Sequence, residues 1–451
     1  MTDTQNSTAR LASIICPIDF DALDEVTISA VKRLIMDGIA VAVAGSKEAP
    51  PEIVGAYVRD LAGPPLATVW GHGFKSTPEH AAYANAVAMH VLDFEPMSNP
   101  ATHAVSPTVP VALALAEASH VRGCDIIAAC AKGFELQGRI LLAAKPARGS
   151  LPFHTPGVIG VMGSAVTAAH LLNLNPSQLT HALGIAASRA SGLPANTGSM
   201  VKCTHCGNAA AAGLESALLA ARGFTANPDI FAAPRGYVET FFPAHFDYDA
   251  LFEFAHPYRC ADPGMAIKFY PSKYPTHFAI TAALEARAAI GDPAHIRAVR
   301  ITTPEIADAN RPQPRSGLEG KFSFQYTAAA ALLDGRVGIS SFNDERRFRA
   351  DMVELLGKTS VVYDPGIPQD TRTMHVTVEV TLADGATHSR TCRKPPGTWG
   401  EPVTAEQHRA KISDCLGVRM NTSQIERTLS LLGRLAHLTA QDVAQLTALL
   451  A

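Results

Sequence analysis

The sequence predicts a mostly α-helical protein in which a large helical region is followed by a smaller α+β region. Three observations support this. Apolar residues recur at helical spacing through most of the first 265 residues. Alternation with a period of two, typical of strands, begins only near residue 270. Because 47% of the 451 residues are hydrophobic and only 18% are charged, the chain can bury a large core.

The N-terminal region is expected to be a bundle of successive helices. The first is predicted over 22–45, with Asp21 as its cap and the apolar side chains on one face. Thr77-Pro78-Glu79 is a typical helix start because it joins a cap, a first-position proline and an acidic first turn. Several of these helices are rich in Ala and Gly, and such small residues allow neighbouring helices to pack closely. The other helices are expected over 50–62, 77–92, 105–121, 124–145, 156–172, 176–190 and 206–222.

The pattern changes to a smaller α+β region over about 270–400. Strands are predicted over 295–303, 374–382 and 387–392, and the last two flank Asp384-Gly385, a strong hairpin signal. A helix is expected over 322–333, ending at Asp334-Gly335. Pro395-Pro396-Gly397 marks the exit from this region. Helices that can pack back on the first region follow over 403–417, 422–433 and 440–450.

Composition and charge argue against several classes of protein. The net charge is −3, so no basic footprint for nucleic acid is present. The sequence contains no run of about 18 apolar residues, the length that a membrane-spanning helix needs, and Asp37 interrupts the longest apolar stretch. The first ten residues lack the features of a secretory signal, and eight cysteines without framework spacing are typical of reduced thiols. We therefore expect a cytoplasmic protein that binds neither nucleic acid nor membrane.

Four proton-carrying residues stand in segments made mostly of small and apolar residues: His103, His154, Lys202 and Lys268. A Lys or His is costly to desolvate in such surroundings unless an anion or an acid/base partner is close. Together with Asp93, they predict a pocket for a small carboxylate. The alternative for Asp93 is a surface carboxylate, and the alternative for His103 is a helix cap.

Metal, redox and dinucleotide sites are disfavoured by spacing. Cys203 and Cys206 form a single C-x-x-C pair, whereas a structural zinc site needs four ligands. The glycines of 157–163 do not match G-x-G-x-x-G, and no strand precedes them. Lys202 and His205 are better interpreted as acid/base or anion-holding groups. The segment 268–277 carries two lysines and a histidine at the junction of the two regions, where ligand pockets are common.

Six sequence blocks, taken in order, resemble the MmgE/PrpD family, which includes 2-methylcitrate dehydratase, cis-aconitate decarboxylase and iminodisuccinate epimerase. They cover nearly the whole chain and are specific jointly. The blocks are HVLDFE, ATHAVSPTVPVALALAE, FHTPGVIGVMGSAVTAAHLLNL, TGSMVKCTHCGNAAAAGLESALLAARGFT, IKFYP and KFSFQYTAAAALLDG.

The resemblance implies an all-helical domain made of residues 1–268 and 403–451, and an α+β lid domain over 269–402. It also implies a homodimer and a lyase, either dehydratase or decarboxylase, that acts on a small di- or tricarboxylate. It further implies chemistry without a metal or an organic cofactor.

Asp93, His103, His154, Lys202 and Lys268 match motif positions of the family, and the chemistry of carboxylate substrates leads to a hypothesis for the role of each. Lys202 and Lys268 would hold carboxylates, His103 and His154 would exchange protons, and Asp93 would orient His103. Asp93, His103, His154 and Lys202 are thus the candidate catalytic residues; Lys268, Lys273, His205 and Met97 are the candidate substrate-binding residues.

Two segments depart from the family pattern. Glu95-Pro96-Met97 stands where the family has Asp-Asp-Thr, so Met97 offers no hydroxyl to a carboxylate. Lys273 stands where the decarboxylase branch has a histidine, and it is suited to bind an extra carboxylate.

Three classes of function follow. The first is a cofactor-free lyase that uses acid/base catalysis on lysine-bound carboxylates. The second is an epimerase of an amino- or imino-dicarboxylate. The third is a carboxylate-binding protein without catalysis.

Overall fold

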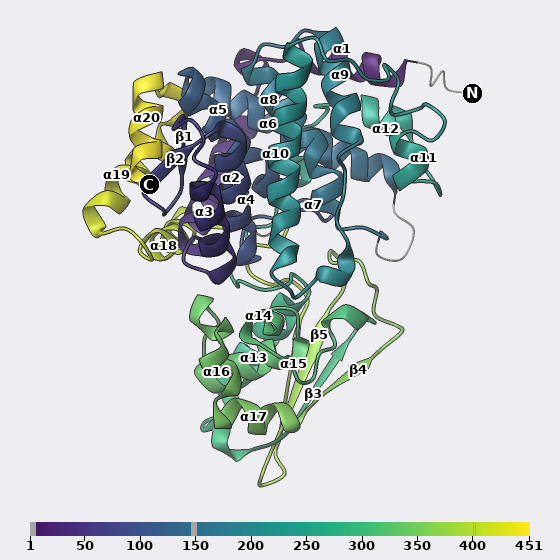
Figure 1. The fold of residues 1–451 in the computed structure, drawn as a ribbon. Coiled ribbons are helices and arrows are strands. Elements are labelled where there is room, and N and C mark those ends of the chain that lie inside the picture. Colours follow the sequence, from purple (N-terminus) through teal and green to yellow (C-terminus); the bar gives the residue numbers. More distant parts are fainter. Residues whose placement is uncertain (1–5, 146–150, 400, 402) are drawn as a thin grey trace.

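The computed structural model describes residues 6–145, 151–399, 401 and 403–451. Figure 1 shows a broad layer of helices above a smaller part that contains a sheet, and the predicted fold class is confirmed. Each part has its own hydrophobic core. The first core runs from Leu11 to Ile267 and resumes at Ile412, whereas the second is built mainly from residues between Tyr274 and Cys392.

The larger part is a bundle of helices around α4 (Pro78–Val91) and α10 (Val201–Ala221). Its other main helices are α1 (Ser7–Ile15), α2 (Glu25–Gly45), α3 (Ala49–Asp60), α5 (Val105–Ser119), α6 (Gly123–Ala144), α7 (Thr155–Val158), α8 (Gly160–Leu171), α9 (Pro176–Ala187), α11 (Tyr237–Phe241) and α12 (Tyr248–Phe252).

Small residues allow α10 to lie directly against its neighbours. A Cβ atom at Gly213 would lie 2.4 Å from the Cβ of Ser164 on α8, and one at Gly207 would lie 2.7 Å from Val87 Cγ2 on α4. Neither position has room for a side chain, because helix interfaces are close-packed. This contact places the N-terminal turns of α10 beside the C-terminal end of α4.

The smaller part packs helices against a four-stranded sheet of order β4-β3-β5-β6. β3 pairs in parallel with β4 and antiparallel with β5, and β5 and β6 form the hairpin predicted around Asp384-Gly385. Its elements are α13 (Thr276–Ile290), β3 (Ile296–Thr303), α14 (Gly317–Gly320), α15 (Phe324–Asp334), α16 (Asp344–Phe348), α17 (Ala350–Gly357), β4 (Thr359–Tyr363), β5 (Val376–Leu382) and β6 (Thr387–Cys392).

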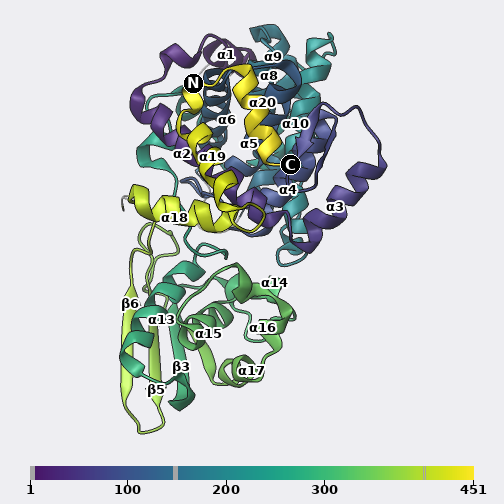
Figure 2. The ribbon, with the colours of Figure 1, turned by 90° about the vertical axis from the view of Figure 1, so that its left-hand side faces the viewer.

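The last three helices return to the larger part, as Figure 2 shows in yellow. They are α18 (Ala405–Leu416), α19 (Thr422–Gly433) and α20 (Ala440–Leu449). α18 packs along α2, and α20 packs on α5. In Figure 2, α18 lies at the lower edge of the helical layer, just above the strands.

Some local predictions were wrong. The cap of α2 is Asp24, whose side chain accepts from Thr27 N at 2.7 Å, and Asp21 lies in a short 3-10 turn before it. The helix predicted over 156–172 is divided into α7 and α8 at Ile159. A small hairpin of β1 (Ala67–Val69) and β2 (Phe74–Ser76) interrupts the helical part. Among the described helices, none combines the length and the hydropathy that a bilayer span needs.

Candidate active site

The site is centred on Asp93, which follows the C-terminal end of α4. Lys202 Nζ, from the first turn of α10, donates to Asp93 Oδ2 at 2.8 Å. Lys268 Nζ, from the segment that leads into the smaller part, donates to Asp93 Oδ1 at 2.5 Å. All three residues are buried, so two ammonium groups converge on one carboxylate away from water.

Electrostatics keep Asp93 ionised. Burial would raise its pKa, but the charges of Lys202 and Lys268 outweigh that effect and hold the pKa well below its usual value. Burial lowers the pKa of Lys268, and Asp93 opposes the shift. For Lys202, burial is outweighed by Asp93, and the pKa is raised. Lys202 is therefore a stable cation at neutral pH.

A second buried pair, His90 and Glu95, lies beside these lysines. His90 Nδ1 is in short hydrogen-bond contact with Glu95 Oε1, and His90 Nε2 lies 3.1 Å from Lys202 Nζ. Burial, followed by the charge of Lys202, lowers the pKa of His90 to about 4. Because Lys202 is a donor only, neutral His90 accepts at Nε2 and donates from Nδ1 to Glu95.

His103 joins the two carboxylates. Its Nδ1 lies 3.1 Å from Glu95 Oε1, and its Nε2 lies 3.6 Å from Asp93 Oδ1. Glu95 Oε1 also accepts from Ser106 Oγ at 2.8 Å, at the start of α5. Asp93, Lys202, His90, Glu95 and His103 thus form a closed ring of neighbouring ionisable groups. Glu95 stands nearer to the His103 ring than Asp93 does, and its position suits the orienting role that sequence reasoning gave to Asp93.

His154 and His205 form a pair at the edge of this ring. Their Nδ1 atoms lie 3.0 Å apart, and the His154 ring centroid lies 5.5 Å from that of His90. Burial is the main cause that lowers both pKa values, followed by the charge of Lys202, and the pKa of His154 falls well below its usual value. His154 is therefore neutral at physiological pH, in contrast to the lysines beside it.

The smaller part adds three cations to the site. Lys273 pairs with Asp308, and burial lowers its pKa. Lys321 Nζ donates to the carbonyl oxygen of Val91, the last residue of α4, at 3.3 Å. Burial lowers the pKa of Lys321 to about 8. Arg311 donates to the Thr197 carbonyl at 3.2 Å. The contacts of Lys321 and Arg311 hold the smaller part against the end of α4 and the segment before α10.

The structure thus brings together Asp93, His103, His154, Lys202, Lys268 and His205, while Lys273 lies at the edge. Met97 is placed differently. Its backbone pairs with Ala266, and its buried side chain belongs to the core of the smaller part. Its assignment to substrate binding, like the other site assignments, stays a prediction.

Sequence reasoning missed His90, Glu95 as a site residue, and Lys321. The signal for His90 was present, because it lies three residues before Asp93 near the end of a predicted helix, and residues at that spacing share a face. Lys321 carried a weaker signal as a lysine at the start of an otherwise apolar segment. Its partner is a backbone carbonyl 230 residues away, which no local pattern reveals.

His90, Glu95 and His103 also offer three metal-binding atoms within 4.8 Å of one another. His and carboxylate are common ligands of divalent ions. However, the Lys202 ammonium 3.1 Å from the same His90 ring opposes a second positive charge there. The donor set therefore fits a ring of neighbouring ionisable groups better than a cation site, and the expectation of no metal stays a prediction.

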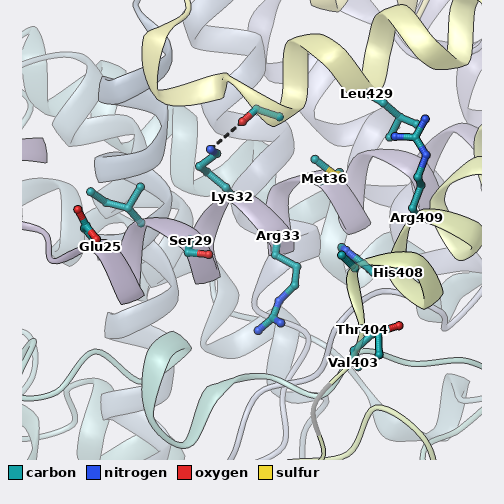
Figure 3. A pocket seen from close by; sticks show the side chains of 13 residues that line it. Glu25, Ser29, Lys32, Arg33, Met36, Val403, Thr404, His408, Arg409 and Leu429 are labelled. Carbon is teal, nitrogen blue, oxygen red and sulfur yellow. Dashed lines mark hydrogen bonds between the residues drawn. The ribbon is translucent and has the colours of Figure 1, made fainter.

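Space is distributed unevenly around these residues. A small cavity of about 10 Å³ beside Lys202, His90 and Phe322 has room for about one water molecule. A much larger groove of about 630 Å³ lies elsewhere, between α2 and the C-terminal helices, and is drawn in Figure 3. None of the predicted site residues lines that groove. Chemistry, rather than cavity size, therefore identifies the candidate active site.

Comparison with known proteins gives matches along nearly the whole chain. The MmgE/PrpD N-terminal domain family matches residues 9–249, and the MmgE/PrpD C-terminal domain family matches residues 270–435. The chain is 31% identical to cis-aconitate decarboxylase of Mus musculus over 98% of its length and 93% of the relative. The human protein of the same name is also 31% identical, with 98% and 94% covered. The 2-methylcitrate dehydratase of Cupriavidus necator is 26% identical, with 58% and 56% covered.

Proposed function

Because this chain belongs to the MmgE/PrpD family and is a lyase of its dehydratase and decarboxylase type, we propose that it decarboxylates a small unsaturated tricarboxylate such as cis-aconitate. We further propose that it needs neither a metal nor an organic cofactor. The observation that carries the proposal is the buried group of Lys202, Lys268 and Asp93, flanked by histidines. The relatives that match along the whole chain are named for this decarboxylation.

The lysines supply the binding site for the substrate carboxylates. Lys202 and Lys268 each have ammonium protons beyond those that Asp93 accepts, and an ammonium group can donate three hydrogen bonds. Asp93 keeps the two like charges together in the absence of substrate. Lys273, at the edge of the site, is suited to a third carboxylate because only Asp308 pairs with it among the described residues.

Decarboxylation breaks the bond between a carboxylate and its carbon atom and leaves the electron pair on the substrate. In an unsaturated tricarboxylate, this charge spreads over the double bond to a carbon beside another carboxylate. Fixed cations in a dry site stabilise such charge strongly. One proton then adds to the carbon, so that CO2 and a dicarboxylate are the products.

His103 is the better candidate for the proton donor. Carboxylates stand near both of its ring nitrogens, Glu95 at 3.1 Å and Asp93 at 3.6 Å, and can pair with an imidazolium. His154 lies next to Lys202 with a pKa well below its usual value, so it is neutral. A neutral imidazole suits a hydrogen bond to substrate or the role of a base. Proton donors of this kind typically contribute 10²–10⁴-fold in rate.

Dehydration is the second candidate. The match to 2-methylcitrate dehydratase favours it, as does the neutral His154–His205 pair, because elimination of water needs a base at carbon. In that reaction, His154 would remove the proton and His103 would protonate the leaving hydroxyl.

Three further expectations remain proposals. We propose that residues 269–402 act as a lid over the site and that the chain forms a homodimer. We also propose a cytoplasmic location.

A mass-spectrometric screen of small polycarboxylates tests the function. Loss of CO2 from an unsaturated tricarboxylate supports the decarboxylase, whereas loss of water indicates the dehydratase. Deuterium uptake without mass loss would point to an epimerase, and calorimetric binding without any turnover would point to a binding protein.

Variants link the activity to the site. His103→Ala and Lys202→Ala should each reduce turnover by about 10²-fold or more. His437→Ala and Lys394→Ala, which change exposed residues outside the site, are the matched controls. Near-normal rates in both site variants would overturn the assignment.

A further inference from the structure

A buried ion pair lies behind the catalytic residues. Asp37, in the middle of α2, is fully buried and accepts from Lys411 Nζ of α18 at 2.8 and 2.9 Å. His408 Nε2, one turn earlier on α18, lies 3.0 Å from Asp37 Oδ2. Burial would raise the pKa of Asp37, but Lys411 and His408 lower it below its usual value. Asp37 is thus a carboxylate whose partners come from the C-terminal part of the chain.

Lys411 extends this pair to the catalytic turn. Its Nζ also donates to the carbonyl oxygen of Phe94 at 3.0 Å and lies 4.2 Å from the centroid of the Phe94 ring. Phe94 stands between Asp93 and Glu95, whose side chains belong to the ring of ionisable groups. Both carbonyl and ring of this one residue are therefore held by the same ammonium group.

The turn needs such support. Asp93 has a φ of +51°, a left-handed backbone conformation that residues other than glycine adopt at a cost in free energy. Conformations of this kind persist only where the surrounding structure fixes them. On the far side, the backbone of Met97 pairs with Ala266 at 3.0 and 2.8 Å. Lys411 is the constraint in the middle of the turn, between Asp93 and that pairing.

We propose that Lys411, held by Asp37, is a positioning residue that fixes the Asp93–Glu95 turn for catalysis. It touches no substrate. It sets where the Asp93 carboxylate meets the lysines and where the Glu95 carboxylate meets the histidines. The effect on turnover rests on the proposed function, whereas the effect on the turn itself does not.

The chain of contacts formed by His408, Asp37 and Lys411 also connects the site to the protein surface. At one end of this chain of contacts, His408 lines the groove drawn in Figure 3. At the other end, Lys411 binds the carbonyl oxygen of Phe94, the residue after Asp93. A single residue, Asp37, joins the two ends. α18 therefore contributes to the active site although it follows α17 and the whole sheet in sequence.

A double variant separates positioning from folding. Removing one partner of a buried ion pair leaves an uncompensated charge and is strongly destabilising, whereas replacing both is often tolerated. In Asp37→Asn with Lys411→Met, both charges are lost and an acceptor for His408 remains. The contacts of the ammonium group with the Phe94 carbonyl and the Phe94 ring have no replacement.

We expect the double variant to fold, to lose turnover by roughly 10–100-fold, and to change KM by less than about 3-fold, since misplaced catalytic groups act on kcat. Hydrogen exchange of residues 92–98, followed by mass spectrometry, should become at least about 10-fold faster in the double variant. Lys32→Met is the matched control, because Lys32 Nζ also donates to a backbone carbonyl, that of Gly433, but outside the site.

Two outcomes are distinguishable. If the folded double variant keeps both wild-type turnover and wild-type exchange over 92–98, the positioning role is overturned. If the wild type turns over nothing in the polycarboxylate screen, the proposed function fails, and the exchange of 92–98 alone decides the role of Lys411.

Discussion

Glu95→Gln tests the ring of ionisable groups most directly, because it removes one charge and almost no volume. The Glu95 carboxylate lies 3.1 Å from His103 Nδ1. At an effective dielectric constant of about 20, a charge pair at that separation is worth roughly 5 kcal/mol, or between three and four powers of ten in rate. Asp93, 3.6 Å from His103 Nε2, remains and retains part of this stabilisation. We therefore expect kcat to fall by about 10²–10³-fold.

The assay is steady-state CO2 release from the substrate identified by the screen, with KM measured in parallel. KM should change little, because Glu95 binds no substrate carboxylate. Thermal unfolding reports the stability of the variant. Loss of the charge-assisted hydrogen bonds from His90 and Ser106 should lower the free energy of unfolding by about 1–3 kcal/mol.

Glu117→Gln is the matched control. Glu117 is also a buried carboxylate, and it accepts from Thr68 N and Thr68 Oγ1 at 2.8 Å each. It lies near the C-terminal end of α5, whereas Ser106, the partner of Glu95, lies at the start of that helix. We expect a similar loss of stability with unchanged kcat. A Glu95→Gln enzyme within about 3-fold of wild-type kcat would refute the reasoning that Glu95 supports His103.

Two further predictions concern the edge and the interior of the site. Lys273→Ala should raise KM for a tricarboxylate by about 10-fold or more while kcat changes less, if Lys273 binds a carboxylate; Lys394→Ala, at an exposed ion pair, should leave both constants unchanged. The pKa of His90 is lowered to about 4 in the folded state, so between pH 6.5 and 4 the unfolded chain binds a proton that the folded chain does not, and stability falls as the pH is lowered. In His90→Asn, proton uptake on unfolding at pH 5 should decrease by about one; an unchanged uptake, measured from the pH dependence of the unfolding free energy, would show that His90 does not titrate in this way.

The element types were readable from the sequence because they depend on local periodicity and caps. Thr77 caps α4 as predicted, and the Asp384-Gly385 hairpin forms as predicted. The boundary of α2 was missed because Asp19, Asp21 and Asp24 all precede it, and each is a suitable cap by type. β4 was also missed; it pairs with β3 in parallel across an intervening stretch of helices, and a short strand of this kind has little local signal.

The composition of the site was partly readable as well. Lysines and histidines in apolar segments predicted a group of buried cations and imidazoles, and Lys202, Lys268, His103 and His154 do lie together around Asp93. Sequence reasoning did not predict which group faces which. His90 is not among the predicted site residues, although its two nitrogens connect Lys202 to Glu95.

The sequence by itself determined the mostly helical class, the hairpin and the kinds of charged groups that the interior has to accommodate. These follow from side-chain periodicity and from the cost of burying charge, which are local properties. The tertiary structure alone decided the pairings. Asp93 meets residues 109 and 175 positions away, and Phe94 meets Lys411 at a separation of 317. Such contacts depend on how helices pack, as at Gly207 and Gly213, and no local pattern contains that geometry.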